Sequence, residues 1–446
     1  MSRGPEAYPT QSKVRTTKIR GGQFFGIPRS LAWGLLAVVL FMAGDGMETA
    51  FLTKYMTTLG LSSSQSAHVV TSYGVAVTIA SWLAGVLAQA HGPRKVMAAG
   101  LGIWIVSHVL FLVFGLQAHN YVAMLVLYGV RGLGYPLFAY AFIVWIAYAA
   151  DKRKLARAMG MYWFAWAFGY GVIGSYLPSA VIPVIGYQAT LWMELGWIVT
   201  GGVLGLTLVR GRFRPVGTGA DAAAAGEQSG TLQVLVRGIT ILARRPRITV
   251  ACGVRTINAL SMYGLPVMMP IFLTDPRVGF TVPQWLQIWA WMFLAIVFTT
   301  PVWGIVADRI GWARQVGWFG CVGTAVATVL FYYVPVEFGA NYWALTGVAV
   351  LLGITLGAFI PMSAIMASLA PPDDRGPAMA IHNIAAGLSN AAAPAIVGLV
   401  LPLRGDGGVI WVFAILYLVA AVLTPFLAPA QRMAALEADA EAAAVT

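Results

Sequence analysis

The stretch FMAGDGMETAFLTKYM, residues 41–56, places two acidic side chains inside an apolar segment. Asp45 and Glu48 are three positions apart, so on a helix they share one face. Burying a carboxylate at membrane depth is energetically expensive, and such residues usually face the interior of a helix bundle, where they have a function. The stretch therefore predicts a membrane helix with a charged, functional face.

Apolar segments of similar length recur along the chain. Of its 446 residues, 59% are hydrophobic and 10% are charged, which excludes an ordinary soluble globular protein. A segment of roughly 20 apolar residues can cross a hydrocarbon layer about 30 Å thick. Twelve such segments span residues 31–57, 67–90, 96–116, 121–149, 158–182, 190–209, 248–273, 284–306, 315–334, 344–369, 378–402 and 409–427. We expect an all-α membrane protein with twelve transmembrane helices in two six-helix bundles.

Basic residues alternate between the connecting segments, and this distribution explains the net charge of +12 without a nucleic-acid partner. HGPRK (91–95), DKRKLAR (151–157), DRIGWAR (308–314), the N-terminal tail and the central segment are basic, whereas SSSQS (62–66), GLQAHN (115–120), IGYQ (185–188) and PVEFGAN (335–341) contain no Lys or Arg. By the positive-inside rule, both termini are expected in the cytosol. We therefore predict a multi-pass membrane protein with both termini in the cytosol.

Other targeting and site signals are weak. The hydrophilic tail of about 30 residues does not resemble a cleavable signal peptide. Cys252 and Cys321 lie in separate apolar segments, so we expect two packing residues and neither a disulfide nor a metal site. The sequence contains no H-E-x-x-H, G-x-S-x-G or G-x4-G-K-[ST] motif, which disfavours a membrane-embedded enzyme. No cofactor is expected.

A hydrophilic segment divides the chain into halves. GTGADAAAAGEQSG (217–230) has the composition of a mobile linker, and TLQVLVRGITILARRPR (231–247) places Leu232, Leu235, Ile239 and Leu242 at helical spacing. This second part predicts an amphipathic helix on the cytosolic membrane surface. The predicted domains are a cytosolic tail (1–30), a six-helix bundle (31–209), a linker (210–247), a second six-helix bundle (248–428) and a cytosolic tail (429–446).

The two halves share a motif. GVLAQAHGPRK (85–95) follows the second apolar segment and GIVADRIGWAR (304–314) follows the eighth, so the motif occupies the equivalent connector of each half. The motif resembles the cytoplasmic loop signature of the major facilitator superfamily, which implies a gating loop formed by Gly85, Arg94, Gly304, Asp308, Arg309, Gly311 and Arg314. The first copy departs from the signature, because Gln89 replaces the usual acid and Pro93 is inserted. We expect the second copy to matter more for gating.

Longer strings resemble one branch of that superfamily. GDGMETAFL (44–52), YGVRGLGYPLFAYAFIV (128–144), IGSYLPS (173–179), VRTINALSMYG (254–264), WLQIWA (285–290), WFGCVG (318–323) and AGLSNAAAPAIV (386–397) are similar to the bacterial polyol permeases, the ribitol and D-arabinitol transporters. The resemblance covers essentially all twelve apolar segments. It implies proton-coupled uptake of a linear sugar alcohol across a bacterial inner membrane. We also expect a monomer surrounded by membrane lipid.

The proton-coupling residues are predicted from charge and depth. Asp45 and Arg131 both fall near the membrane midplane when each segment is built as a helix from its first residue. Burial favours a neutral carboxyl group and a nearby arginine favours a carboxylate, so such a pair can bind and release a proton as its geometry changes. We predict Asp45 as the proton carrier, Arg131 as its partner, and Glu48 as an almost equal candidate. A static structural salt bridge is the alternative.

The substrate-binding residues are predicted from their hydrogen-bonding chemistry. Amides both donate and accept, and aromatic rings stack on a carbon chain while their polar groups reach hydroxyls. The predicted set is Glu48, Tyr135, Arg255, Asn258, Tyr263, Trp289, His382, Asn383 and Asn390. Asn383 and Asn390 are seven apart on one helix face, while His108 and Glu194 are single polar residues for which we favour interhelical bonding.

Two other functions remain compatible with the sequence. A symporter for an organic anion would clamp a carboxylate between Arg131 and Arg255. A sensor would bind its ligand without transporting it. Two acidic residues beside one central arginine leave little spare positive charge, which disfavours the anion.

Overall fold

The computed structural model describes residues 23–24, 27–150, 154–210, 241–371 and 374–429. The two tails and most of the linker, including Leu232, Leu235 and Ile239, lie outside the described residues. Strands β1 (Gln23–Phe24) and β2 (Ile27–Pro28) form a short antiparallel hairpin. The first-half helices are α1 (Arg29–Met47), α2 (Leu52–Thr58), α3 (Ser63–His91), α4 (Pro93–Leu110), η1 (Phe111–Gln117), α5 (Tyr121–Arg131), α6 (Gly134–Ala149), α7 (Leu155–Ala167), η3 (Phe168–Ile173) and α8 (Gly174–Thr207).

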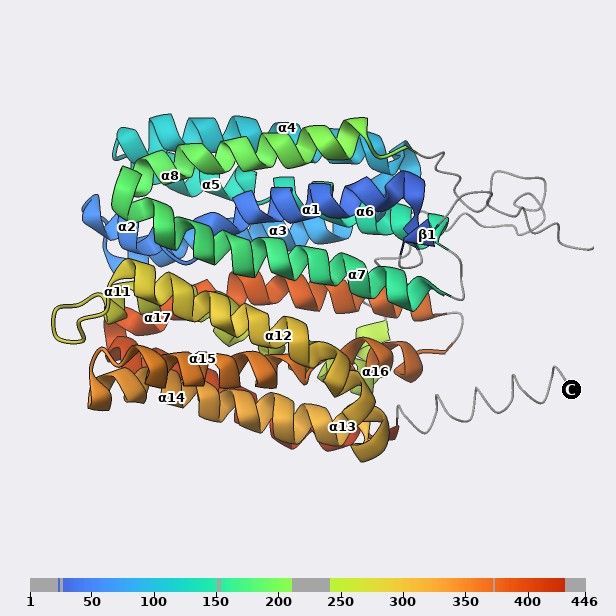
Figure 1. Cartoon of the computed structure of the whole chain (residues 1–446). Coiled ribbons are helices and arrows are strands. Elements are labelled where there is room, and N and C mark those ends of the chain that lie inside the picture. The colour runs from blue at the N-terminus through green and yellow to red at the C-terminus, as the bar shows by residue number, and fades with distance from the viewer. Residues whose placement is uncertain (1–22, 25–26, 151–153, 211–240, 372–373, 430–446) are drawn as a thin grey trace, which may run out of the picture.

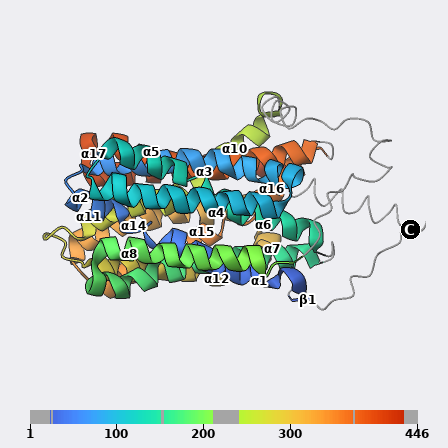
Figure 2. The same ribbon diagram turned by 90° about the horizontal axis from the view of Figure 1, so that it is seen from above.

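The second half is also helical. Its helices are α10 (Pro246–Asn258), α11 (Leu260–Leu273), α12 (Val282–Ile310), α13 (Trp312–Arg314), η5 (Gln315–Val322), α14 (Gly323–Phe338), α15 (Tyr342–Gly357), α16 (Met362–Leu369), α17 (Arg375–Leu423) and η7 (Thr424–Leu427). The long helices run side by side, with β1 and α13 at one end of the bundle and α2 and α11 at the other (Figures 1 and 2).

Ten helices in the described part of the chain are long and apolar enough to cross a membrane. Two of them, Arg157–Thr207 and Ala378–Leu427, have 51 and 50 residues, and each contains two of the twelve predicted segments. The backbone of each is broken at a glycine, Gly186 with φ 77° and Gly405 with φ 65°. Glycine suits these breaks because a residue with a Cβ rarely adopts a positive φ. The prediction of an all-α membrane protein is confirmed.

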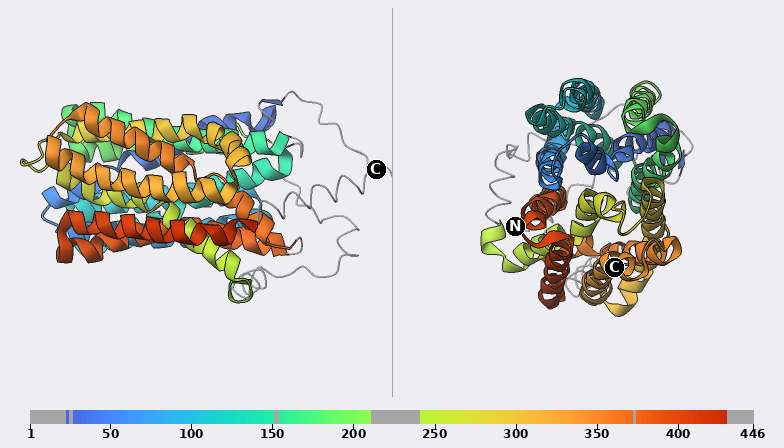
Figure 3. Two further views of the ribbon diagram at one scale, coloured as in Figure 1. Left: turned by 90° about the horizontal axis from the view of Figure 1, so that it is seen from below. Right: turned by 90° about the vertical axis from the view of Figure 1, so that its left-hand side faces the viewer.

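The halves predicted from the sequence form two groups of helices. Viewed from the α2 and α11 end, first-half helices (blue to green) lie on one side and second-half helices (yellow to red) on the other (Figure 3, right). The groups meet where α3 packs on α17 and where η3 and α8 pack on α12. Gly74 of α3 lies against the backbone of Asn390, and Gly171 of η3 lies against the Phe293 ring. Small residues allow helices to approach this closely.

The internal repeat is visible in the helices that carry it. α3 and α12 both have 29 residues and both begin with a capping box, formed by Ser62 with Gln65 and by Thr281 with Gln284. The capping side chains satisfy backbone N–H groups that the first helical turn leaves unpaired. Both helices end at a glycine with positive φ, at 87° in α3 and 98° in α12. The two helices therefore correspond from their first turn to the loop motif that follows them.

Four of the predicted segments are broken near their middle. Segments 31–57, 121–149, 248–273 and 344–369 each become two helices: α1 and α2, α5 and α6, α10 and α11, and α15 and α16. Glu48 follows α1 directly, Arg131 is the last residue of α5, and Asn258 is the last residue of α10. Apolar length does not record a local break in the backbone, so the twelve predicted segments did not indicate these positions.

Hydrogen bonds between the halves hold the α2 and α11 end together. The Trp285 indole N–H donates to the carbonyl of Ala50 at 2.6 Å, and the Ser64 hydroxyl donates to the carbonyl of Gly398 at 2.8 Å. The Thr53 hydroxyl donates to the carbonyl of Pro266 at 3.3 Å. These three bonds join the first half to the second half at this end.

The close approach of α3 and α17 predicts a sensitive glycine. A Cβ at Gly74 would lie 2.0 Å from the Asn390 carbonyl oxygen, and backbone cannot rotate away. We expect Gly74→Ala to destabilise the protein by about 1–3 kcal/mol, the usual range for overpacking, and to slow transport. Thermal unfolding in detergent and initial uptake rate are the measurements. Gly102→Ala is the matched control, because nothing lies within 4 Å of that position. Equal melting temperatures for the two variants would contradict the prediction.

Candidate functional site

The acidic residues of the opening stretch lie inside the first half. Helix α1 packs closely against α8, since a Cβ at Gly44 would lie 2.7 Å from Ile198 and 3.0 Å from the carbonyl oxygen of Glu194. This approach brings Asp45 and Glu48 beside α8, while Trp104 of α4 bonds to Asp45 and Arg131 of α5 bonds to Glu48. The buried polar residues here are Asp45, Glu48, His108, Arg131 and Glu194. We call these five residues the charged cluster.

The Arg131 guanidinium is the centre of the charged cluster. Nη1 donates to Glu48 Oε2 at 2.7 Å and Nη2 donates to Glu48 Oε1, so the ion pair is bidentate. The Tyr128 hydroxyl donates to the same Oε1 at 2.6 Å. The guanidinium carbon lies 4.5 Å from the centre of the Trp104 ring and 4.8 Å from that of Tyr128. Aromatic faces of this kind stabilise a desolvated cation.

Asp45 is the more distant of the two carboxylate partners of Arg131. Its Oδ1 lies 3.7 Å from Arg131 Nη2, beyond hydrogen-bonding distance. The Asp45 carboxylate instead accepts the Trp104 indole N–H at 2.7 Å and the Tyr73 hydroxyl at 3.2 Å. Glu48 is the nearer carboxylate because it follows the end of α1 and approaches Arg131 more directly. Spacing along a continuous helix could not predict this difference.

His108 bonds between helices, as expected, and both His108 and Glu194 lie within the charged cluster. His108 Nδ1 lies 3.0 Å from Arg131 Nη1, and its Nε2 lies 3.0 Å from the carbonyl oxygen of Leu191 and 3.2 Å from Glu194 Oε1. Neither Glu194 oxygen has a hydrogen-bond partner of good geometry among the described residues. The prediction treated the two residues as separate, because they lie on helices that are far apart in the sequence.

The charged cluster has some features of a metal site but is better explained as an ion-pair network. Glu48, His108 and Glu194 offer ligand atoms within 4.8 Å of one another. Arg131 already bonds to both oxygens of Glu48 and faces the free nitrogen of His108. A metal ion there would lie beside a guanidinium, whose charge opposes it. We therefore assign no metal ligands to these residues.

A second polar group lies in the other half. Arg255 Nη1 donates to the Asn258 side-chain oxygen, and Arg255 Nε has no partner among the described residues. The Asn258 carbonyl accepts the Tyr417 hydroxyl at 3.2 Å. His382 is buried, and its Nδ1 is likewise without a partner in the described part of the chain. The structure thus places Arg255 beside Asn258, as their spacing predicted, and gives the arginine no acidic partner in the residues that it describes.

The predicted aromatic residues separate into two kinds. Tyr135 packs edge-to-face on Tyr140, with their hydroxyls 3.4 Å apart, and Tyr263 lies close to Asn390 and within electrostatic range of Tyr140. These residues connect polar groups of both halves. Trp289 instead is buried in an aromatic cluster, with Trp285, Phe293 and Phe331 as its neighbours. Its position is that of a packing residue in the second half.

The predicted asparagines of α17 and the predicted gating-loop residues lie outside the charged cluster. Asn390 is half-buried and Asn383 is exposed, although they are seven apart on α17. In the loop motifs, Arg94 donates to the carbonyl of Leu206, and Asp308 accepts the Trp312 indole N–H at 3.4 Å. Space is open around Gly85 and Gly304, where nothing lies within 4 Å of an added Cβ. The expected gating roles stay predictions.

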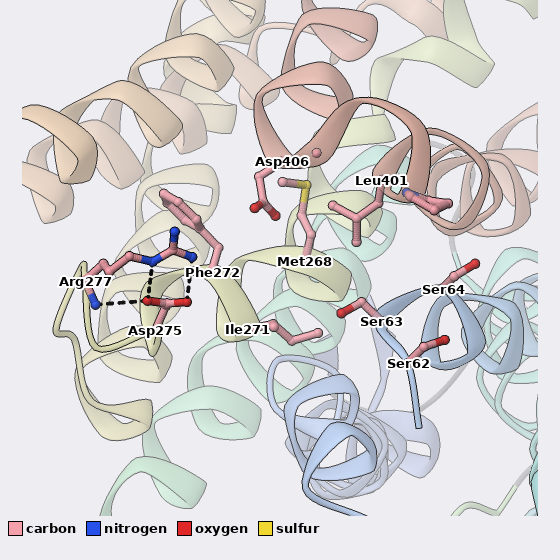
Figure 4. A pocket seen from close by; sticks show the side chains of 12 residues that line it. Ser62, Ser63, Ser64, Met268, Ile271, Phe272, Asp275, Arg277, Leu401 and Asp406 are labelled. Carbon is pink, nitrogen blue, oxygen red and sulfur yellow. Dashed lines mark hydrogen bonds and ion pairs between the residues drawn. The ribbon is translucent and has the colours of Figure 1, made fainter. Parts of the chain in front are cut away.

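A pocket of about 430 Å³ lies at the α2 and α11 end, where the halves meet. Ser62, Ser63 and Ser64 line it from the start of α3, and Met268 and Asp406 line it from the second half (Figure 4). Nearby, Asp275 and Arg277 are joined by side-chain hydrogen bonds of 2.9 and 3.0 Å. These bonds lower the pKa of Asp275 from its usual value to about 2. The pocket lies at the α2 and α11 end of the bundle and shares no lining residue with the charged cluster.

The architecture and the sequence agree on a family. The model of the Major Facilitator Superfamily matches residues 34–291 and 251–444. The chain belongs to the major facilitator superfamily. A solved D-xylose–proton symporter has the same fold, with a TM-score of 0.67 at 15% identity over 89% of this chain and 96% of that one. Superfamily membership makes this protein a membrane transporter and not an enzyme.

Relatives named for different substrates are about equally similar to the chain. It is 40% identical to the ribitol transporter of Klebsiella pneumoniae over 92% of this chain and 94% of that one, and 39% identical to the D-arabinitol transporter of the same organism over 92% and 95%. It is also 39% identical to the alpha-ketoglutarate permease of Bacillus subtilis (strain 168), over 90% of each chain. The resemblance to polyol transporters is confirmed, but identity alone does not separate a polyol from a dicarboxylate.

Sequence reasoning missed the aromatic lining of the charged cluster. Trp104 and His108 are four apart on α4, and Tyr128 and Arg131 are three apart on α5. Each pair therefore presents an aromatic ring and a polar group on one helix face. That spacing was a usable signal, although only the packing of α4 on α5 shows that both faces meet the same two carboxylates.

The bidentate pair predicts that lysine cannot replace Arg131. A single ammonium cannot occupy both Glu48 oxygens and also face His108, so Arg131→Lys would leave a buried acceptor unsatisfied, at a cost of about 1–3 kcal/mol. We expect uptake to fall at least about ten-fold, since roughly 1.4 kcal/mol corresponds to a factor of ten. Initial uptake rate at matched protein levels is the measurement. Arg157→Lys, at an exposed position on α7, is the control. A variant with near-normal uptake would show that bidentate geometry is not required.

Proposed function

We propose that this protein is a secondary transporter that takes up a linear sugar alcohol, such as ribitol or D-arabinitol, together with a proton. We also propose twelve membrane crossings in two six-helix bundles, an arrangement that allows alternating access between them. The helical segments of 51 and 50 residues would each be about 75 Å long if unbroken, at roughly 1.5 Å per residue, which is more than twice a hydrocarbon layer of ~30 Å. Each is broken at a glycine, which supports two crossings per segment. We further propose a monomer in the bacterial inner membrane with cytosolic termini.

Proton coupling is supported by the buried charges of the first half. Arg131 is paired with Glu48, and Asp45 lies 3.7 Å from the same guanidinium. A guanidinium between two carboxylates has two alternative partners, so protonation of one carboxylate favours the pair with the other. Such an exchange would let a proton change the geometry between α1 and α5. Asp45 and Glu48 therefore both belong to the proposed coupling machinery.

A neutral substrate is supported by the state of Arg131. Its two terminal nitrogens are held by Glu48 and His108, so the central cation of the first half is not free to bind a substrate carboxylate. Hydroxyls and an amide lie between the halves, on Tyr135, Tyr140, Tyr263 and Asn390. These groups suit the alternating donors and acceptors of a polyol. The ribitol and D-arabinitol transporters among the relatives support the same substrate class.

An organic anion is the second candidate, because Arg255 is uncompensated. Its Nε is unpartnered and its Nη1 bonds only to the neutral Asn258 among the described residues. A carboxylate would satisfy this guanidinium well, and the alpha-ketoglutarate permease is among the relatives. The two candidate substrates differ in what Arg255 must supply. A polyol needs one hydrogen bond from Arg255 to a hydroxyl, whereas an organic anion needs its charge neutralised by Arg255.

The coupling proposal predicts a separation of binding from driving force. Asp45→Asn keeps the side-chain shape but removes the second anionic partner of Arg131. We expect loss of uphill uptake driven by a pH gradient, with counterflow of labelled ribitol retained. Both are measured in proteoliposomes, and Glu48→Gln is the comparison variant. Full gradient-driven accumulation in Asp45→Asn would remove Asp45 from coupling, whereas loss in Glu48→Gln alone would transfer its role to Glu48.

The substrate proposal predicts that pentitols displace the ligand and dicarboxylates do not. Uptake of labelled ribitol would be measured against unlabelled D-arabinitol, xylitol, mannitol and 2-oxoglutarate, under imposed pH and sodium gradients. We expect Asn258→Ala to weaken ribitol binding about ten-fold, since a buried polar group left without its hydrogen-bond partner costs about 1–3 kcal/mol. Gln117→Ala, an exposed amide on η1, is the control. Preferential displacement by 2-oxoglutarate, with binding lost in Arg255→Gln, would instead establish the anion symporter.

A further inference from the structure

The charged cluster has more acidic groups than cations. Asp45, Glu48 and Glu194 are three buried carboxyl groups, and Arg131 is the one arginine that contacts them among the described residues. Asp45 accepts hydrogen bonds from Trp104 and Tyr73, whereas Glu48 accepts them from Arg131 and the Tyr128 hydroxyl. Glu194 accepts no hydrogen bond of good geometry from the described residues. An ionised Glu194 would therefore be a buried and uncompensated charge, which is strongly unfavourable.

His108 cannot supply the missing positive charge in this arrangement. Arg131 Nη1 can only donate, so His108 Nδ1 at 3.0 Å must be the accepting, unprotonated nitrogen. The ring proton therefore sits on Nε2, which faces the carbonyl of Leu191 at 3.0 Å and Glu194 Oε1 at 3.2 Å. A second ring proton would point at the guanidinium and place two donors against each other. The geometry holds His108 neutral.

Glu194 also lies close to a like charge. Ligand oxygens of Glu48 and Glu194 are within 4.8 Å of each other, and both side chains are buried. Two carboxylates this close in a low-dielectric site do not both stay ionised. Because Glu48 already pairs with Arg131, the neutral member is Glu194. The groups facing Glu194 are Asp45 and Glu48 from α1 and its end, His108 from α4 and Arg131 from α5.

We propose that Glu194 on α8 is the proton-holding residue of the carrier, which rests on the proposed proton coupling and adds a residue to it. A proton taken from the aqueous phase resides on a Glu194 oxygen while Glu48 is paired with Arg131. When the helices move and water reaches Glu194, its charge is no longer uncompensated, and transfer of this proton to Glu48 leaves Glu194 ionised and Glu48 neutral. Arg131 then loses its bidentate partner and turns to Asp45. One proton moves between two carboxyl groups, and no other reactant is required.

The decisive readout is the protonated carboxyl group itself. A buried neutral acid gives a carboxylic C=O stretching band in the infrared spectrum. The spectra would be recorded on the purified full-length protein across pH 5 to 8. We expect this band in the wild-type protein and its loss in Glu194→Gln, with the band retained in Asp45→Asn. Glu337→Gln, at an exposed position on α14, is the matched control and keeps the band. This measurement needs no substrate, so it stands apart from the proposed function.

Transport provides a second readout in the same variants. In Glu194→Gln we expect loss of pH-driven ribitol accumulation, and retained counterflow that no longer varies with pH. A wild-type protein that shows the band but does not accumulate ribitol would refute the proposed substrate or coupling and leave the proton site intact. The inference is overturned if the band persists in Glu194→Gln, if it disappears only in Glu48→Gln, or if wild type has none. Retained counterflow shows that the variant is folded.

Discussion

The burial of one guanidinium in the first half determines how the neighbouring helices must be arranged. Arg131 is removed from water and can exist there only because Glu48 binds it through two hydrogen bonds and aromatic faces of Trp104 and Tyr128 cover it. A buried charge without such partners is severely destabilising. The requirement brings α1, α4 and α5 together at one depth. It also explains why polar residues distant in the sequence meet here.

The two halves use their charges differently. In the first half the arginine is surrounded by acidic groups, and a rearrangement of protons among them can change helix contacts. In the second half Arg255 is bonded to an amide and retains a nitrogen without a partner among the described residues. In the proposed function, the first half responds to a proton and the second half receives oxygen atoms of a substrate. This division of roles needs both bundles, which agrees with a site located between them.

The membrane character, the two halves and their repeat could be predicted from the sequence, because apolar length and the loop motif record them directly. Asp45, Glu48 and Arg131 could also be predicted, since charges inside apolar segments are conspicuous. The bidentate pairing with Glu48 could not, because it depends on the break after α1. His108 and Glu194 meet because α4 packs on α8. No pattern within either segment of the sequence predicts that contact. Helix breaks and contacts between distant segments are thus where sequence reasoning stopped.

The order of these charges along the chain has a consequence for biogenesis. Asp45 and Glu48 enter the membrane with the first apolar segment, while Arg131 is synthesised only with the fourth. A central aspartate alone raises the insertion free energy of a helix by about 2.5–3.5 kcal/mol on the translocon scale. Nascent first segments therefore remain poorly accommodated by lipid until α5 arrives, and Glu194 on α8 completes the set later still. The first half, as far as α8, is therefore the shortest part of the chain in which every one of these charges has its neighbours.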